Sequence, residues 1–228
     1  RFNVKGSRLI NMSGERFKVA IVIPAFNEGA TIGQVVKLAG KHGTVIVVND
    51  ASTDNTNSEA IKMGAILVNH SRNKGYDEAL NSGFMKAYEL RCNAVITFDA
   101  DGQHSHELLP VYIELLRRRV KLVLGVRPKK QRVSESLFAF YTKFMFGWND
   151  PLCGMKGYSM SLYTDRGYFD SIESIGTELA FYGIHNKLKF SEVKIPEIKR
   201  QDSPRFHSIY IANVKIIKSL IKLIRKYR

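Results

Sequence analysis

Two aspartates at the end of one apolar segment, Asp99 and Asp101, are the residues whose types and spacing point most directly to chemistry. They close the apolar run 94–98, which predicts a buried strand, and side chains two residues apart in an extended segment face the same side. Gly102 permits the backbone to turn beyond them. Paired carboxylates suit Mg²⁺ or Mn²⁺, which completes its shell with water and phosphate oxygens. The alternative interpretation is a solvated acidic turn after a strand.

Short apolar runs alternate with amphipathic stretches along the first 126 residues, and this alternation predicts an α/β fold with a mostly parallel sheet flanked by helices. The predicted strands are 19–23, 45–49, 65–68, 94–98 and 122–126, and the predicted helices are 31–41, 55–63, 76–90 and 106–118. Ligands of such sheets bind beyond the carboxyl ends of the strands, where Asn27, Glu28 and Asp50 join the two aspartates. The sequence has neither a dinucleotide-binding glycine fingerprint nor a P-loop, which argues against dinucleotide oxidoreductases and NTPases.

The 228 residues carry a net charge of +14, of which residues 194–228 contribute +8. Such a surface suits anionic lipid, anionic substrates or nucleic acid, but no nucleic-acid-binding motif accompanies it, so we expect no nucleic-acid partner. Two distant cysteines indicate no disulfide framework. The sequence has neither a signal-peptide pattern nor an apolar run of the length that spans a membrane. These features predict a cytoplasmic protein, peripheral on the cytoplasmic face of a membrane.

Two segments of the second half of the chain have a composition that suits a lipid surface. Residues 137–148 are half aromatic and follow the basic loop 127–132. They form either a buried helix on the sheet or a partly exposed apolar surface for lipid. From residue 207 onward, a helix would gather its lysines and arginines on one arc with isoleucine and leucine on the rest. That pattern is typical of an interfacial helix, and the alternative is packing on the domain or on a membrane partner subunit.

Four ordered motifs together resemble one protein family: 23–28 (IPAFNE), 47–56 (VVNDASTDNT), 72–75 (RNKG) and 99–104 (DADGQH). The chain resembles family 2 glycosyltransferases with the GT-A fold, and within them the dolichyl- or polyprenyl-phosphate sugar synthases. The resemblance extends over about 19–205. It implies an N-terminal extension at 1–17, a Rossmann-like GT-A domain at 18–206 and a basic amphipathic C-terminal helix at 207–228.

The resemblance implies a nucleotide-sugar donor, linked to GDP or UDP, and a divalent metal, Mg²⁺ or Mn²⁺. The implied donor contacts are Pro24, Asn27, Glu28, Asp50, Ser52, Arg72, Lys74, Asp99 and Ala100. The implied metal ligands are Asp99, Asp101 and Gln103. Helix capping is the alternative for Asn27 and Asp50, a turn for Ser52, and a solvated loop for Arg72 and Lys74.

The acceptor decides which further groups an inverting displacement needs. A sugar hydroxyl needs a carboxylate base, and the resemblance makes Asp150 and Glu178 candidates alongside the catalytic Asp99 and Asp101. Glu178 is alternatively an acid at a helix N-terminus. A lipid phosphate is already anionic and needs only cations. The basic residues that suit such a phosphate are Arg127, Lys129, Arg132, Arg200 and Arg205. The family usually has a glycine before its final Ser-Lys pair, where this chain has Asp202-Ser203-Pro204-Arg205, which puts the role of that loop in question.

Three functions therefore remain open from the sequence. The first is sugar transfer to a polyprenyl or dolichyl phosphate at an anionic membrane surface. The second is transfer to a saccharide or protein hydroxyl, and the third is an inactive nucleotide-sugar-binding scaffold. The presence of Asp50, Asp99 and Asp101 argues against the scaffold, which has no need of them.

Overall fold

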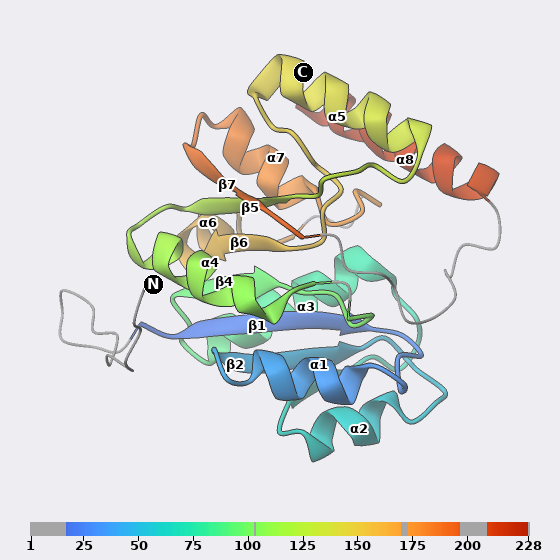
Figure 1. The fold of residues 1–228 in the computed structure, drawn as a ribbon, viewed down its shortest axis with the longest axis vertical. Helices are drawn as coiled ribbons and strands as arrows, with labels where there is room; N and C mark the ends of the chain where they lie inside the picture. Colours follow the sequence, from blue (N-terminus) through green and yellow to red (C-terminus); the bar gives the residue numbers. More distant parts are fainter. Residues whose placement is uncertain (1–16, 103, 170–172, 197–208, 228) are drawn as a thin grey trace.

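A computed structural model describes residues 17–102, 104–169, 173–196 and 209–227 as one α/β structure built on a seven-stranded sheet (Figure 1). The strand order is β3-β2-β1-β4-β6-β5-β7. The strands are β1 (Val19–Ala25), β2 (Thr44–Asn49), β3 (Ile66–Asn69), β4 (Ala94–Thr97), β5 (Leu122–Val126), β6 (Lys156–Ser159) and β7 (Phe190–Lys194). The predicted α/β class and mostly parallel sheet are confirmed.

Strand direction brings the polar loops to one edge of the sheet. Strands β1, β2, β3 and β4 pair in parallel, and β5 pairs in parallel with β7. Strand β6 runs antiparallel to both β4 and β5, so β4 and β5 themselves point the same way. The loops after β1, β2, β4 and β5 therefore lie at the same edge. All five predicted strands are present, whereas β6 and β7 were not predicted from the sequence.

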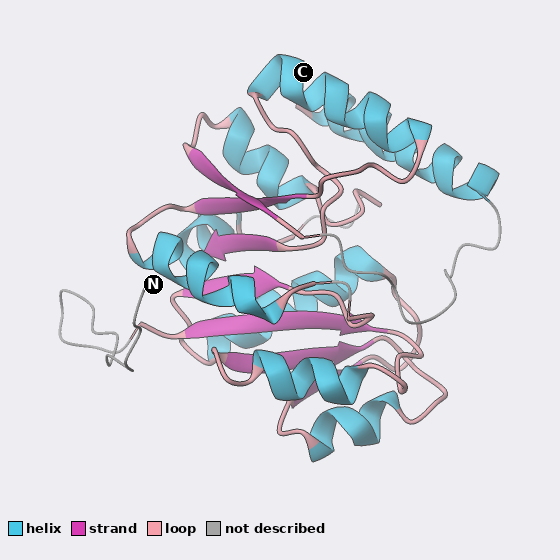
Figure 2. Cartoon of the chain, viewed as in Figure 1, coloured by secondary structure: helices cyan, strands magenta, loops and turns pink. Residues whose placement is uncertain are grey.

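Helices cover both faces of the sheet (Figure 2). The helices are α1 (Ile32–Ala39), α2 (Thr56–Lys62), α3 (Tyr76–Glu89), α4 (Leu109–Arg117), α5 (Val133–Phe146), α6 (Met160–Arg166), α7 (Glu178–His185) and α8 (Ile209–Lys226), with a 3₁₀ turn at His106–Leu108 before α4. Alternate side chains of β1 serve the two faces. Ile21 and Ile23 pack with α1 and α4, whereas Ala20 and Val22 pack with α3. A sheet buried on both faces explains why its central strands are apolar throughout.

Helices α5 and α8 lie side by side and cover the β5–β7 end of the sheet (Figure 1). Ser134 near the start of α5 bonds to Asn213 of α8, with 2.5 Å between Oγ and Oδ1. Phe138 of α5 and Leu223 of α8 are fully buried. One face of α5 packs inward, as the buried-helix interpretation predicts, and another face is exposed; its use as a lipid surface stays a prediction. Packing on the domain is likewise observed for α8. No helix in the described part of the chain is long and apolar enough to cross a membrane.

Candidate active site

The loops after β1 and β2 are joined by hydrogen bonds around Asn27. Its backbone has φ 54°, the left-handed conformation that asparagine tolerates better than most residues. Its Oδ1 accepts a hydrogen bond from the Thr53 N–H at 2.8 Å, and its own N–H donates to Ser52 Oγ at 2.9 Å. The next residue, Glu28, is buried, and its N–H donates to Thr56 Oγ1 at 2.7 Å. These contacts bring the predicted donor residues Asn27, Glu28 and Ser52 together.

Asp50 is the first residue of the loop after β2 and is buried, with 4% of its surface exposed. Its carboxylate accepts hydrogen bonds from the backbone N–H groups of Lys74 and Gly75, both at 2.8 Å. His70 Nδ1 lies 2.6 Å from Oδ1, and Nε2 of the same ring lies 2.9 Å from Ser82 Oγ. Asp50 therefore fixes the turn before α3, where Gly75 has φ 89°. The predicted nucleotide-sugar contacts Arg72 and Lys74 lie in this loop before α3 and have exposed side chains.

A tyrosine and a histidine lie against the two oxygens of the Asp99 carboxylate. The Tyr76 hydroxyl donates to Oδ1 at 3.1 Å, and His104 Nε2 lies 3.3 Å from Oδ2. His104 Nδ1 accepts the backbone N–H of Asp99 at 3.0 Å, so a neutral ring carries its proton on Nε2, the nitrogen nearer to the carboxylate. His104 is buried, whereas the Asp99 side chain remains 30% exposed. The carboxylate is thus oriented but open to a ligand.

The backbone of Gly154 also lies close against the Asp99 carboxylate. A Cβ atom at position 154 would lie 2.3 Å from Asp99 Oδ2, so a side chain there would displace the carboxylate. Two buried groups fix this turn: Thr97 Oγ1 donates to the Gly154 carbonyl at 2.6 Å, and Lys156 Nζ donates to the Cys153 carbonyl at 2.5 Å. Burial lowers the pKa of Lys156. The turn 153–156 therefore depends on contacts with β4, far away in sequence.

The oxygen donors present fit a hard divalent metal. Asp99 keeps an exposed carboxylate, and Asp101 follows in the turn with a half-buried side chain. Ala100, which the resemblance predicts to contact the nucleotide sugar, lies between them and is buried. The third predicted ligand, Gln103, lies outside the described residues. No cluster of three or more His, Cys, Asp or Glu side chains occurs among the residues that the structure describes. Two carboxylates with phosphate and water suit Mg²⁺ or Mn²⁺, whereas zinc sites use nitrogen and sulfur.

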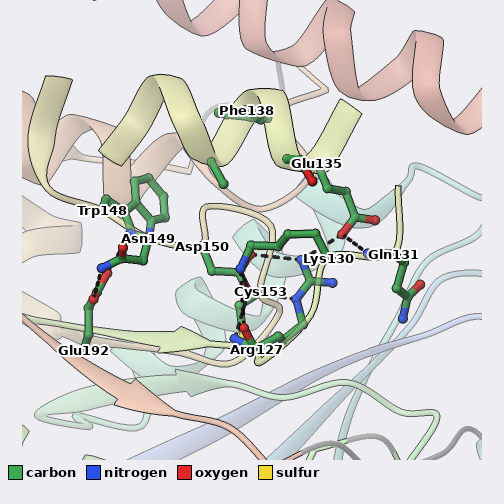
Figure 3. A network of polar contacts seen from close by, with 12 residues as sticks. Arg127, Lys130, Gln131, Glu135, Phe138, Trp148, Asn149, Asp150, Cys153 and Glu192 are labelled. Carbon is green, nitrogen blue, oxygen red and sulfur yellow. Dashed lines mark hydrogen bonds and ion pairs between the residues drawn. The ribbon is translucent and has the colours of Figure 1, made fainter. Parts of the chain in front are cut away.

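Asp150, a predicted catalytic residue, is locked in an ion pair instead of standing open to solvent (Figure 3). Its side chain is 1% exposed, and its two oxygens accept from Nε and Nη2 of Arg127 at 2.9 and 3.0 Å. Lys130 Nζ lies 3.2 Å away. Burial acts to raise the pKa of Asp150, but the bonds and charge of Arg127, helped by Lys130, hold this pKa below its ordinary value of 3.8. This environment opposes proton uptake by Asp150.

Glu135 of α5 extends the same network and ties down the predicted phosphate-binding loop. Its carboxylate lies 3.1 Å from Arg127 Nη2 and 2.9 Å from Arg132 Nη1, and it accepts the Gln131 N–H at 3.2 Å. The side chain of Lys129 is exposed. Arg127 and Arg132 are thus already oriented by carboxylates. The other two predicted phosphate ligands, Arg200 and Arg205, lie outside the described residues.

Glu178, the other candidate base, is fully buried at the first position of α7. Its Oε1 accepts from Arg166 Nη2 at 3.0 Å and from Lys226 Nζ at 2.7 Å, and it also accepts the Tyr227 hydroxyl. These partners come from α6 and from the end of α8. Glu178 therefore joins three helices and lies at a helix N-terminus, while its catalytic role stays a prediction.

The sequence profile of glycosyl transferase family 2 matches residues 20–162, which include the Asn27, Asp50 and Asp99 loops. The chain belongs to glycosyl transferase family 2. Among similar proteins, the UDP-N-acetylglucosamine–dolichyl-phosphate N-acetylglucosaminyltransferase of Methanococcus voltae is 27% identical, over 90% of this chain and 95% of that protein. The dolichyl-phosphate hexose transferase of Haloferax volcanii is 25% identical, over 90% of this chain and 93% of its own.

The fold of this family 2 chain also has solved counterparts. Glucosyl-3-phosphoglycerate synthase from Mycobacterium tuberculosis, in complex with Mn²⁺, UDP and glucosyl-3-phosphoglycerate, superimposes with a TM-score of 0.71. The two are 19% identical, and the match covers 90% of this chain and 79% of that one. The GT-A fold expected from the sequence is confirmed.

Some residues of the site in this family 2 chain escaped sequence reasoning. Tyr76 was interpreted only as the start of a helix, yet its hydroxyl reaches Asp99, 23 positions along the chain. No motif in the sequence marks His70 or Glu135, although they bind Asp50 and Arg127. Their partners lie 8 to 23 residues away, so no local spacing marks them. Pro24 lies on β1 as its last residue but one, half-buried at the same edge of the sheet.

Proposed function

We propose that this protein transfers a sugar from a GDP- or UDP-linked donor to a polyprenyl or dolichyl phosphate at an anionic membrane surface. The observation that carries this proposal is the state of the two candidate bases. Asp150 is paired with Arg127 and Lys130, and Glu178 with Arg166 and Lys226. A hydroxyl acceptor needs a carboxylate that takes up its proton, whereas a phosphate acceptor needs none.

The loop after β5 supplies the cations that a phosphate acceptor needs. Residues 127–135 and Asp150 together carry two more positive than negative charges. Arg127 directs Nε and Nη2 at carboxylates and is 23% exposed. Carboxylates that hold an arginine in one orientation prepare it for an anion, because the guanidinium donors then need no reorganisation. The names of the two archaeal relatives, both dolichyl-phosphate transferases, support the same acceptor.

On this proposal, the reaction is an inverting displacement at the anomeric carbon. A phosphate oxygen of the acceptor forms the new bond as the bond to the nucleoside diphosphate breaks, and no proton moves. Asp99 and Asp101, with Gln103, would hold Mg²⁺ or Mn²⁺, which supplies positive charge to the departing diphosphate. The solved Mycobacterium tuberculosis counterpart was crystallised with Mn²⁺ and UDP. The loops around Asn27, Glu28, Asp50 and Ser52 would take the nucleoside.

The outer surface of α5 and α8 supports a position on the surface of an anionic membrane. Successive turns of α5 expose large apolar side chains along one stripe of the helix, and Phe144 is 80% exposed. The other members are Val133, Leu137, Phe140 and Met145. The neighbouring α8 presents exposed cations, namely Lys215, Lys218, Lys222 and Arg225. Apolar side chains beside a row of cations are the features by which interfacial helices bind anionic bilayers.

The test compares two acceptors that differ only in the phosphate. The protein, with Mn²⁺ and anionic vesicles, is given a panel of GDP- and UDP-sugars and either a polyprenyl phosphate or the matching polyprenol. We expect glycolipid from the phosphate alone, with one donor preferred. We expect Asp99→Asn to lower the rate by about 10³-fold, as removal of groups that stabilise developing charge does. Transfer to the polyprenol or to a saccharide would favour a hydroxyl acceptor, and absence of transfer with donor binding retained would favour a scaffold.

A further inference from the structure

Three consecutive residues at the start of α3 each reach a different part of the candidate site. The Gly75 N–H donates to Asp50, on the nucleoside side. The Tyr76 hydroxyl donates to Asp99, on the metal side. Asp77 turns the other way and accepts hydrogen bonds from the loop before α7. Of the three, Tyr76 is the one that contacts Asp99.

The Tyr76 hydroxyl is the donor in its hydrogen bond to Asp99. An ionised carboxylate only accepts hydrogen bonds, so the proton of this bond belongs to the tyrosine. This bond orients one oxygen of Asp99 without neutralising the carboxylate, and His104 Nε2 lies 3.3 Å from the other oxygen. The carboxylate keeps its attraction for a cation and loses its freedom to rotate.

The ring of Tyr76 is itself held by the segment 174–176. A Cβ atom at Gly176 would lie 2.7 Å from Tyr76 Cε1, so the ring packs directly on this backbone. Gly176 has φ 69°, and its N–H donates to Asp77 Oδ1 at 2.6 Å. The Ser174 N–H donates to Asp77 Oδ2, also at 2.6 Å. The residue beside Tyr76 thus anchors the backbone that supports its ring.

We propose that Tyr76 is a positioning residue that sets the orientation of the Asp99 carboxylate, and that the segment 174–176 holds Tyr76 in place. This inference rests on the proposed function, because it concerns how Asp99 meets a metal–diphosphate complex. Hydrogen-bond partners of a metal-binding carboxylate typically change metal affinity by 10- to 100-fold when they are removed. Tyr76 therefore acts through Asp99 and contributes to metal affinity without touching the metal.

The test is Mn²⁺ affinity, measured by the electron paramagnetic resonance signal of free Mn²⁺ in the presence of UDP and, in parallel, GDP. Tyr76→Phe removes only the hydroxyl, and we expect it to weaken Mn²⁺ binding by about tenfold with no change in thermal unfolding. Tyr88→Phe is the matched control, because Tyr88 lies on the same helix and is 58% exposed. We expect the control to bind Mn²⁺ as the wild type does.

A second variant approaches the same contact from the other side. Gly176→Ala places a methyl group against the Tyr76 ring in a strained conformation, and we expect weaker Mn²⁺ binding in whatever fraction folds. Unchanged Mn²⁺ affinity in Tyr76→Phe, with a wild type that binds Mn²⁺, would overturn this inference and leave the proposed function intact. A wild type that binds no Mn²⁺ with either nucleotide would overturn both.

Discussion

The carboxylates of this protein are held in two different ways, and the difference follows the sheet. At the β4 end, Asp99 is bound by a tyrosine and a histidine, and its side chain is 30% exposed. At the β5 end and beyond, Asp150 and Glu178 are bound by arginine and lysine, and at most 1% of each side chain is exposed. Neutral donors orient a negative charge, whereas cationic donors cancel it.

This contrast separates carboxylates that can attract a ligand from those that maintain the structure. Asp99 keeps a net negative charge open to solvent, as a divalent cation requires. A buried carboxylate paired with two cations has neither the charge nor the access for that task. Of the four acidic residues that the resemblance makes catalytic candidates, Asp99 stays open to a ligand and Asp101 is half-buried, whereas Asp150 and Glu178 are held in buried ion pairs. The experiments on Glu178 and Asp150 below test that division.

The largest expected effect is on stability, from Glu178→Gln. The substitution leaves Arg166 and Lys226 partly buried without their carboxylate, and breaking a buried pair typically costs about 3–5 kcal/mol. We expect the free energy of unfolding in urea to fall by about 3 kcal/mol. The measurement is equilibrium denaturation followed by circular dichroism.

The matched control for that experiment is Glu114→Gln, which removes an exposed carboxylate from Arg117 and Arg118. Exposed pairs contribute little, so we expect a change of less than about 1 kcal/mol. If Glu178→Gln unfolded as the wild type does while losing sugar transfer, Glu178 would be a catalytic residue and the division would fail.

A smaller effect, on membrane binding, is expected from a substitution in the exposed apolar stripe of α5. Phe144→Ser removes a side chain that is 80% exposed, so it should leave stability within about 0.5 kcal/mol of the wild type. Binding to anionic vesicles, measured by sedimentation, should weaken by about tenfold, because part of a phenylalanine no longer enters the interface. Tyr88→Ser, on α3 and also exposed, is the control and should bind vesicles normally. Equal binding by wild type and Phe144→Ser would show that α5 does not contact lipid.

Much of the donor side of the sheet was predictable, because its residues lie within a few positions of strand ends. The run before Asp99 has the apolar pattern of β4, and a parallel sheet brings Asn27, Asp50 and Asp99 to one edge. Helix periodicity likewise located α1 through α4. The family motifs then added the order in which these loops occur.

The far side of the sheet was less predictable, because its contacts join distant segments. Asp150 pairs with Arg127, which lies 23 positions earlier in the chain. Glu178 pairs with Lys226, which lies 48 positions later. Strand β6 is four residues of mixed polarity, Lys156–Ser159, and becomes a strand only through pairing with β4 and β5. Short segments of this kind take their structure from tertiary context, which local propensity does not contain.

The smallest expected effect is a change in how stability depends on pH, from Asp150→Asn. The folded-state pKa of Asp150 lies below its ordinary value of 3.8, so the unfolded chain binds this proton first as the pH falls. The stabilisation is therefore complete above that ordinary pKa and is lost as the pH falls from there through the folded-state pKa. One proton changes the slope by at most about 1.4 kcal/mol per pH unit. We expect the free energy of unfolding of Asp150→Asn to fall less steeply below pH 4 than that of the wild type. Parallel curves would mean that Asp150 has an ordinary pKa in the folded protein, and that its pairing with Arg127 does not hold it ionised.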